Sequence, residues 1–217
     1  KCQANIKSGA RCSRTADLNS KYCWQHKNSS NNLKDTSQLI PDIENIVSEY
    51  LDAKTYLGLI KLYPNKYSIA KYEDLIVDKL RQEQNQKLIS VDAEIKSLQS
   101  QNLDFIFEEL SEAISEKFSI LNKNIMSTLK VLEDLEILKV LDETFDPDYI
   151  PIKWINPPKE LHNFVSFEGG LSTHGDDLIF FYDNTDFNFK STRIYELLRD
   201  NMITAQNFIN AEESKAR

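Results

Sequence analysis

Hydrophobic residues recur in one regular pattern along the middle of the chain. From Leu103 to Leu132 they follow one another at steps of four and three residues, which add up to a repeat of eleven. The residues of this stripe are Leu103, Phe107, Leu110, Ile114, Phe118, Leu121, Ile125, Leu129 and Leu132. An eleven-residue repeat is close to the period of a straight α-helix. Because no Gly or Pro occurs from Asn65 to Asp146, the pattern predicts a long helix over about 86–141, either continuous or folded back as a helical hairpin.

The stripe has two possible uses that the sequence leaves open. A homo-oligomer could assemble through 103–132, since a sustained apolar stripe is typical of helices that pair with a second copy. The stripe could instead lie inside an α domain as its central core helix. The bulky Phe107 and Phe118 are wide for a two-stranded seam and favour packing on a domain.

A second amphipathic pattern precedes the long helix. Apolar residues at i, i+3, i+4, i+7 and i+8 predict a helix that begins near Pro41, a residue well suited to a first helical turn. They are Ile43, Ile46, Val47, Tyr50 and Leu51. A short helix closed by Pro64 and another from Ile69 are expected to follow. Together with the long helix they predict a helical body over 38–143.

The last third of the chain has a different pattern. The runs YIPIKWI, NFVSFEG and DLIFFYD read as short strands, and the pairs Gly169-Gly170 and Asp183-Asn184 read as turns. A final amphipathic helix is expected from Thr192 to Ala211. The sequence therefore predicts a mainly α fold with a small α+β C-terminal region, the latter over 144–217.

Charge divides the chain into a basic head and an acidic body. The 217 residues carry a net charge of −8, but residues 1–34 alone carry +6, because this segment contains seven Lys and Arg residues and a single acidic residue, Asp17. The rest of the chain therefore carries −14. A basic head indicates an anionic partner, or else a solvated surface without one. No apolar run approaches the ~20 residues that span a bilayer, and the start of the chain lacks the apolar region of a secretory signal.

All three cysteines lie in the head, in the pattern C-x9-C-x10-C-x2-H formed by Cys2, Cys12, Cys23 and His26. Three thiolates and one imidazole complete the tetrahedral shell of a structural zinc ion, whereas an odd number of cysteines fits a disulfide framework poorly. We therefore expect one structural Zn²⁺ in a module over 1–27, with clustered surface thiols as the alternative. The polar segment 28–37 reads as a linker.

The head resembles a known kind of module. CQANIKSGARCSRTA and YCWQHK are similar to a short zinc-binding module of phage and giant-virus proteins, and to the cysteine repeat of the plant effector-of-transcription proteins, which are associated with DNA. The resemblance implies contacts to nucleic acid through residues 1–34. The phosphate-contacting side chains would be Lys7, Arg11, Arg14, Lys21 and Lys27, with Trp24 stacking on a base.

Residues 39–64 resemble the F-box of giant-virus proteins, through Pro-Asp, IVSEYLD and a second short helix with spaced leucines. The resemblance implies docking on the Skp adaptor of cullin–RING ubiquitin ligases. The partner-binding residues would be Pro41, Ile43, Ile46, Val47, Tyr50 and Leu51. The alternative is an ordinary three-helix packing unit.

Catalytic signatures do not emerge from the sequence. His174 lies beside Asp176 and Asp177, twelve residues after His162, but no phosphate-binding loop, nucleophile elbow or zinc-protease motif accompanies them. We therefore expect a non-enzymatic, zinc-binding modular adaptor or assembly protein of a large DNA virus, located inside the host cell or in the virion rather than secreted. The alternatives are a zinc-dependent nucleic-acid-binding protein and a virion structural component.

Overall fold

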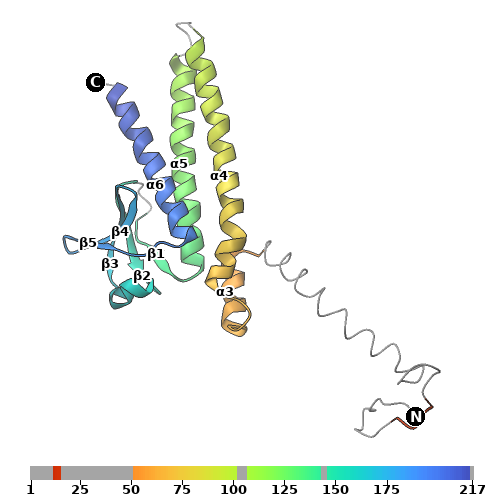
Figure 1. Cartoon of the computed structure of the whole chain (residues 1–217). Helices are drawn as coiled ribbons and strands as arrows, with labels where there is room; N and C mark the ends of the chain where they lie inside the picture. Colours follow the sequence, from red (N-terminus) through yellow and green to blue (C-terminus); the bar gives the residue numbers. More distant parts are fainter. Residues whose placement is uncertain (1–11, 16–50, 102–106, 143–145, 216–217) are drawn as a thin grey trace. The chain divides into compact units, whose positions relative to one another are not determined.

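The described part of the chain comprises residues 12–15, 51–101, 107–142 and 146–215 of a computed structural model. The chain divides into two units, Lys1–Tyr50 and Leu51–Arg217, and every described helix and strand belongs to the second (Figure 1). The expected zinc module, apart from residues 12–15, lies outside the described residues. So do the linker over 28–37 and residues 39–50 of the F-box-like segment.

Four α-helices make up most of the second unit. They are α3 (Ala53–Leu62), α4 (Ile69–Ser100), α5 (Phe107–Asp134) and α6 (Arg193–Lys215). The side chain of Asp52 accepts a hydrogen bond from the backbone N–H of Thr55 at 2.7 Å, and Ser68 accepts one from Lys71 at 3.3 Å. These two N-caps start α3 and α4, since they satisfy donors that a helix leaves unpaired at its first turn.

Helices α4 and α5 form an antiparallel hairpin. Lys117 Nζ lies 2.6 Å from Asp92 Oδ1, and Gln84 Nε2 donates to the carbonyl oxygen of Asn124 at 3.1 Å, so the two helices run in opposite directions side by side (Figure 1). The continuous helix over about 86–141 is therefore wrong, and the hairpin that the pattern also allows is present. Folding back lets the two helices pack against each other along their lengths, which one straight helix cannot do.

The end of α5 also differs from the expectation. The helix stops at Asp134, and Glu136 takes the left-handed conformation with φ 55°. The N–H of Ile137 donates to the carbonyl of Leu132 at 3.0 Å, which is the pattern of a Schellman C-cap. The first strand follows at once, inside the range expected to be helical. The sequence gives little sign of this stop because Glu, rather than Gly, occupies the left-handed position.

Five strands form an antiparallel sheet in chain order. They are β1 (Leu138–Val140), β2 (Ile150–Trp154), β3 (Glu168–His174), β4 (Asp177–Tyr182) and β5 (Thr185–Asn188), with a 3-10 helix, η1 (Lys159–Phe164), between β2 and β3. The fold is thus mainly α with a small α+β C-terminal region, as the sequence predicts.

The predicted strands are correct for β2 and β4 and wrong for NFVSFEG. Phe164 ends η1, and Ser166 has a φ of 68°, which breaks the extended run before β3 begins at Glu168. Gly169 and Gly170, expected to form a turn, lie inside β3. A Cβ atom on Gly169 would lie 2.5 Å from the ring of Phe180 and 2.6 Å from the carbonyl oxygen of Phe181. Glycine is needed here because rings and backbone approach too closely for a side chain.

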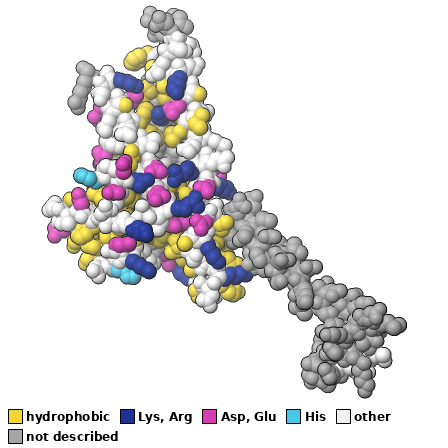
Figure 2. Space-filling view, viewed as in Figure 1, with side chains coloured by type: hydrophobic (Ala, Val, Ile, Leu, Met, Phe, Trp, Pro, Cys, Tyr) yellow, Lys and Arg dark blue, Asp and Glu magenta, His cyan; other side chains and the backbone are white. Residues whose placement is uncertain are grey.

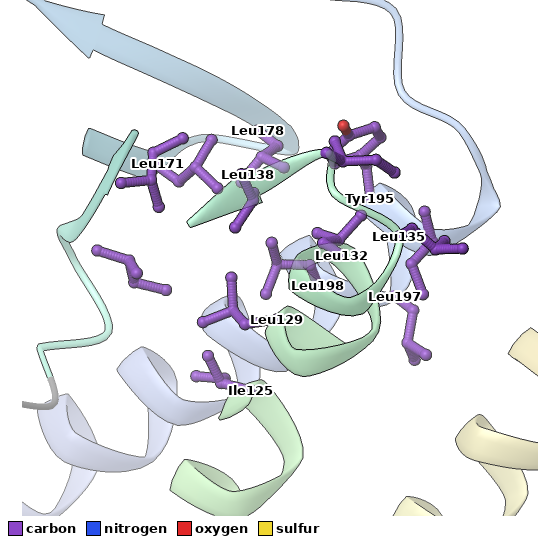
Figure 3. Close-up of a cluster of buried hydrophobic side chains, with 14 of the residues drawn as sticks. Ile125, Leu129, Leu132, Leu135, Leu138, Leu171, Leu178, Tyr195, Leu197 and Leu198 are labelled. Carbon is purple, nitrogen blue, oxygen red and sulfur yellow. The ribbon is translucent and has the colours of Figure 1, made fainter. Parts of the chain in front are cut away.

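One hydrophobic core joins the helices to the sheet. Figure 3 shows side chains of α5 and α6, including Leu129, Leu132 and Leu198, pointing toward Leu138, Leu171 and Leu178 of the sheet. Trp154 and Phe180 are also fully buried in this core. Helices of the expected body over 38–143 and strands of the expected region over 144–217 thus share one core within the unit Leu51–Arg217.

A layer of polar side chains crosses the three long helices, with Gln84 and Thr128 buried and Asn201 half-buried. Asn201 Nδ2 of α6 donates to Gln84 Oε1 of α4 at 3.0 Å and to Thr128 Oγ1 of α5 at 3.2 Å. Gln84 Nε2 also donates to Thr128 Oγ1 at 3.2 Å. Because unpaired buried amides are costly, this layer favours one register of the three helices over any shifted one.

No helix in the described part of the chain combines the length and apolar character needed to cross a membrane.

The glycine in β3 gives a first prediction. Gly169→Ala places a Cβ atom against the buried Phe180 ring and the backbone oxygen of Phe181, so we expect a loss of about 2 kcal/mol in the free energy of unfolding. Gly58→Ala is the matched control, since its Cβ atom would meet nothing within 4 Å in α3 and should raise stability by up to about 1 kcal/mol. Urea denaturation measures both. Equal stabilities of the two variants would contradict the packing around Gly169.

A buried carboxylate joins α4 to the start of α6. Glu73 is buried and accepts a hydrogen bond from Thr192 Oγ1 at 2.8 Å. Burial raises the pKa of the Glu73 carboxyl above its usual 4.5, although the hydrogen bond from Thr192 and the charge of Arg193 act in the opposite direction. The folded chain therefore binds this proton more tightly than the unfolded chain does. The resulting stabilisation is present below pH 4.5 and is lost as the pH rises through the raised pKa.

The second prediction uses an uncharged replacement for this acid. Glu73→Gln keeps an oxygen that accepts from Thr192 and removes the charge, so its stability relative to wild type should increase as the pH is raised from about 4 to about 7. Urea midpoints of both proteins at the two pH values measure this. A stability difference that is the same at both values would show that ionisation of Glu73 does not act on folding.

Candidate protein-docking groove

The stripe on α5 is covered at one end of the helix and open at the other. Leu121 is 1% exposed, and Ile125, Leu129 and Leu132 are fully buried against α6 and the sheet. Toward the N-terminal end of α5, Phe118 is 39% exposed and Phe107 is 83% exposed. The same repeat that predicts the helix therefore supplies core residues in one half and surface residues in the other.

A groove opens beside the exposed half of the stripe, where α6 diverges from α5 toward its C-terminal end (Figure 1). This α5–α6 groove has a volume of about 340 Å³. It is lined by Ile114, Ser115 and Phe118 of α5, and by Phe208, Ile209, Glu212 and Glu213 of α6. Figure 2 shows hydrophobic side chains reaching the surface in this upper part of the helical bundle. Four of the seven lining residues are large and apolar, so the groove favours an apolar occupant.

Lys117 fixes one side of the groove. Its Nζ lies 2.6 Å from Asp92 Oδ1 of α4 and 4.6 Å from the centre of the Phe208 ring of α6. The ammonium thus makes an ion pair and a cation–π contact at once, and it links all three helices at this level. Phe208 is held in place by this contact, which gives the groove one fixed wall.

The groove has an acidic rim. Glu212 and Glu213 line it directly, and Glu212 is paired with Lys215 at 2.7 Å. The neighbouring half of α5 carries four exposed glutamates, Glu108, Glu109, Glu112 and Glu116. Counted over 107–118 and 208–215, the two helix segments that flank the groove carry a net charge of −4. This patch combines an apolar floor with a negative edge.

Most of the site residues predicted from the sequence lie outside the described residues. Of the predicted zinc ligands, Cys2, Cys23 and His26 are outside, while Cys12 is described and buried. Of the predicted nucleic-acid contacts, only Arg14 is described, and it is exposed. Within the described ranges, no group of three or more His, Cys, Asp or Glu could hold a metal ion.

Only Leu51 of the predicted F-box contacts is described. It is half-buried and packs against the core, and its carbonyl oxygen accepts a hydrogen bond from the Tyr72 hydroxyl at 3.4 Å. Pro41, Ile43, Ile46, Val47 and Tyr50 are outside the described residues. The F-box interpretation therefore remains a prediction.

The two histidines of the C-terminal region lie on the surface in different elements. His162 is exposed in η1. His174 is exposed at the end of β3 and pairs in register with Asp177 across a tight turn, in which Gly175 has a φ of 59°. His174, Asp176 and Asp177 therefore belong to a polar hairpin turn.

The sequence contains one signal for the groove, in the different lengths of the apolar stripes on α5 and α6. The stripe on α5 begins two helical turns before Ile114, whereas the stripe on α6 ends at Phe208 and the polar run AEESK follows. Helix α6 therefore has no apolar residue to cover the first turns of α5. The homo-oligomer expected over 103–132 can use only the exposed half, because Leu121 to Leu132 are buried within the chain.

Comparisons with known proteins give no match: no family model, no curated protein and no solved structure resembles this chain closely enough to be recognised.

The open half of the stripe leads to a third prediction. Leu129→Ala should lower the free energy of unfolding by about 3 kcal/mol, because it removes a fully buried side chain from the core. Phe118→Ala on the same stripe should cost under about 1 kcal/mol, because its ring is 39% exposed. Urea denaturation of the two variants measures the difference. Similar losses would show that the groove is closed in solution.

Proposed function

We propose that this chain is a zinc-binding modular adaptor that docks a protein partner in the α5–α6 groove. The proposal rests on one observation: the exposed fraction of the side chains rises along a single stripe of α5, from fully buried Leu132 to Phe107 at 83%. A folded chain exposes a contiguous apolar patch at a cost in solubility, and such patches are typical of interaction sites. The groove offers an apolar floor of about the size that binding pockets have.

The rigidity of the groove supports docking. Lys117 links α4, α5 and α6 beside it, and the polar layer around Gln84, Thr128 and Asn201 fixes their register. A preformed groove binds more tightly than one that must be ordered on binding, because little conformational entropy is lost. The acidic rim restricts the partners that fit.

The zinc module is the second part of the proposal, and it rests on the sequence. Cys2, Cys12, Cys23 and His26 supply the four ligands of a structural site, and a module of 27 residues has too small a core to fold without such a staple. In this proposal the zinc ion holds the head together and takes part in no reaction. The head is then a second interaction surface on the same chain.

A fourth prediction tests this division of roles. The full chain should contain about one zinc ion per molecule by metal analysis. A Cys23→Ser, His26→Ala variant should contain none, while its body should still unfold at the wild-type urea concentration, because the body forms its own core. Retained zinc in the variant would refute the ligand set. A joint loss of zinc and of body stability would refute the modular organisation.

The partner is found with the full chain as bait and is then verified with purified components. Binding should be lost with Phe118→Ser in the groove and kept with Ile89→Ser, a control on α4 that is 68% exposed and outside the groove. If a purified partner binds both variants equally, its docking surface lies outside the α5–α6 groove. The F-box-like segment over 39–64, with the Skp adaptor as partner, is the first such alternative.

The basic head makes nucleic-acid binding the second candidate function. Its net charge of +6 would give an affinity that falls steeply with salt, since each phosphate contact releases counterions. Fluorescence anisotropy tests whether the head binds DNA. It is measured across a salt series with the intact chain and with the Cys23→Ser, His26→Ala variant. Zinc-dependent binding near physiological salt would support this function over a purely structural head.

A further inference from the structure

The α5–α6 groove has features that select a class of occupant, and the inference below rests on the function proposed above. The floor is apolar, and both walls are helices. The flanking segments carry a net charge of −4. We propose that the occupant is an amphipathic helix of a protein partner, with an apolar stripe on one face and Lys or Arg on its flanks.

Because α5 and α6 form its walls, the groove favours a helical occupant over an extended peptide. Helices α5 and α6 use their backbone groups internally and offer no free sheet edge along the groove. An extended peptide laid on this apolar floor would bury N–H and C=O groups without partners, and each would cost free energy. A helix satisfies its own backbone and presents only side chains, so it is the conformation that this surface accepts.

The length of the exposed stripe fits such a helix. From Phe107 to Phe118 the exposed half covers twelve residues of α5, and its two ends are about 16 Å apart along the helix. An occupant helix with apolar residues at i, i+4, i+7 and i+11 presents a stripe of the same length. It would fill the wedge between α5 and α6 as a fourth helix of the bundle.

The charged residues around the groove favour a basic occupant. The positive charges near the groove are already engaged, since Lys117 pairs with Asp92 and Lys215 pairs with Glu212. Glu212 and Glu213 line the groove, and no Lys or Arg is among its lining residues, so the rim is negative. A second copy of this chain would bring the same acidic surface to the contact, and like charges would oppose its docking. A partner with Lys or Arg beside its apolar stripe gains from the same field.

Three designed peptides test the inference. Each has about 18 residues and the same leucines at i, i+4, i+7 and i+11, and the remaining positions are rich in Lys, Gln or Glu. Fluorescence anisotropy with the full chain measures their affinities. The Lys peptide should bind about tenfold or more tightly than the Glu peptide at low salt, and the gap should narrow as salt is added.

Variants show whether the groove is the binding site. Phe118→Ser should abolish binding of the Lys peptide, and Ile89→Ser should leave it unchanged. Glu213→Lys should weaken binding of the Lys peptide about fivefold and strengthen binding of the Glu peptide. Because Glu213 is exposed at the end of α6, this variant keeps the fold, which its circular dichroism spectrum verifies.

The outcomes separate the inference from the proposed function. Equal binding of all three peptides, with loss in Phe118→Ser, would overturn the charge selection and leave docking in the groove intact. Tighter binding of the Glu peptide would also overturn the inference. Failure of all three peptides to bind would overturn the groove as a docking site, and with it the proposed function.

Discussion

The burial of one apolar stripe on α5 organises the second unit of this chain. In its C-terminal half the stripe is the centre of a core to which α4, α6 and the sheet all contribute, with Ile125, Leu129 and Leu132 fully buried. The sheet is present on only one half of α5, and α6 diverges beyond it (Figure 1). Among the described residues, the other half of the stripe is therefore only partly covered, and the candidate site is a direct consequence of where the core ends.

Polar interactions keep this arrangement in register without closing the groove. The layer formed by Gln84, Thr128 and Asn201 lies at the level of the buried core, where Thr128 stands between Ile125 and Leu129 on α5. Lys117, farther along, holds α4 and α6 against α5 through an ion pair and the face of Phe208. Together they hold the three helices in place beside the groove. The groove is thus a supported feature of the fold and does not depend on a partner for its shape.

The sequence predicts those parts of the fold that follow from hydrophobic period. The helical stripe on α5, the strands β2 and β4 and the final helix are all visible as patterns of apolar residues. Two of the errors lie where single residues take left-handed conformations without being glycine. Glu136 ends α5 in this way, and Ser166 displaces the start of β3. Such positions are decided by tertiary contacts, here the carbonyl of Glu136 accepting from Asn156 at 2.7 Å.

The candidate site is less predictable than the fold for a related reason. A stripe of apolar residues shows that a helix has a face to bury, but it does not show which part of that face a neighbour reaches. Phe118 and Leu129 occupy equivalent positions in the repeat, yet the first is 39% exposed and the second is fully buried. The difference depends on the length of α6 and on its angle to α5, which the local pattern does not contain. The predicted zinc site differs from the groove in this respect. The spacing of its ligands in the sequence is informative, but three of the four ligands lie outside the described residues.

Native-state hydrogen exchange along α5 tests the central claim most directly. If one half of the stripe is core and the other half is open, amides from Leu121 to Leu132 should exchange only through global unfolding. Amides from Phe107 to Phe118 should then exchange through local opening, about a hundredfold or more faster. Uniform protection along the whole helix would contradict the account, because it would mean that the first turns of α5 are as well covered as the core.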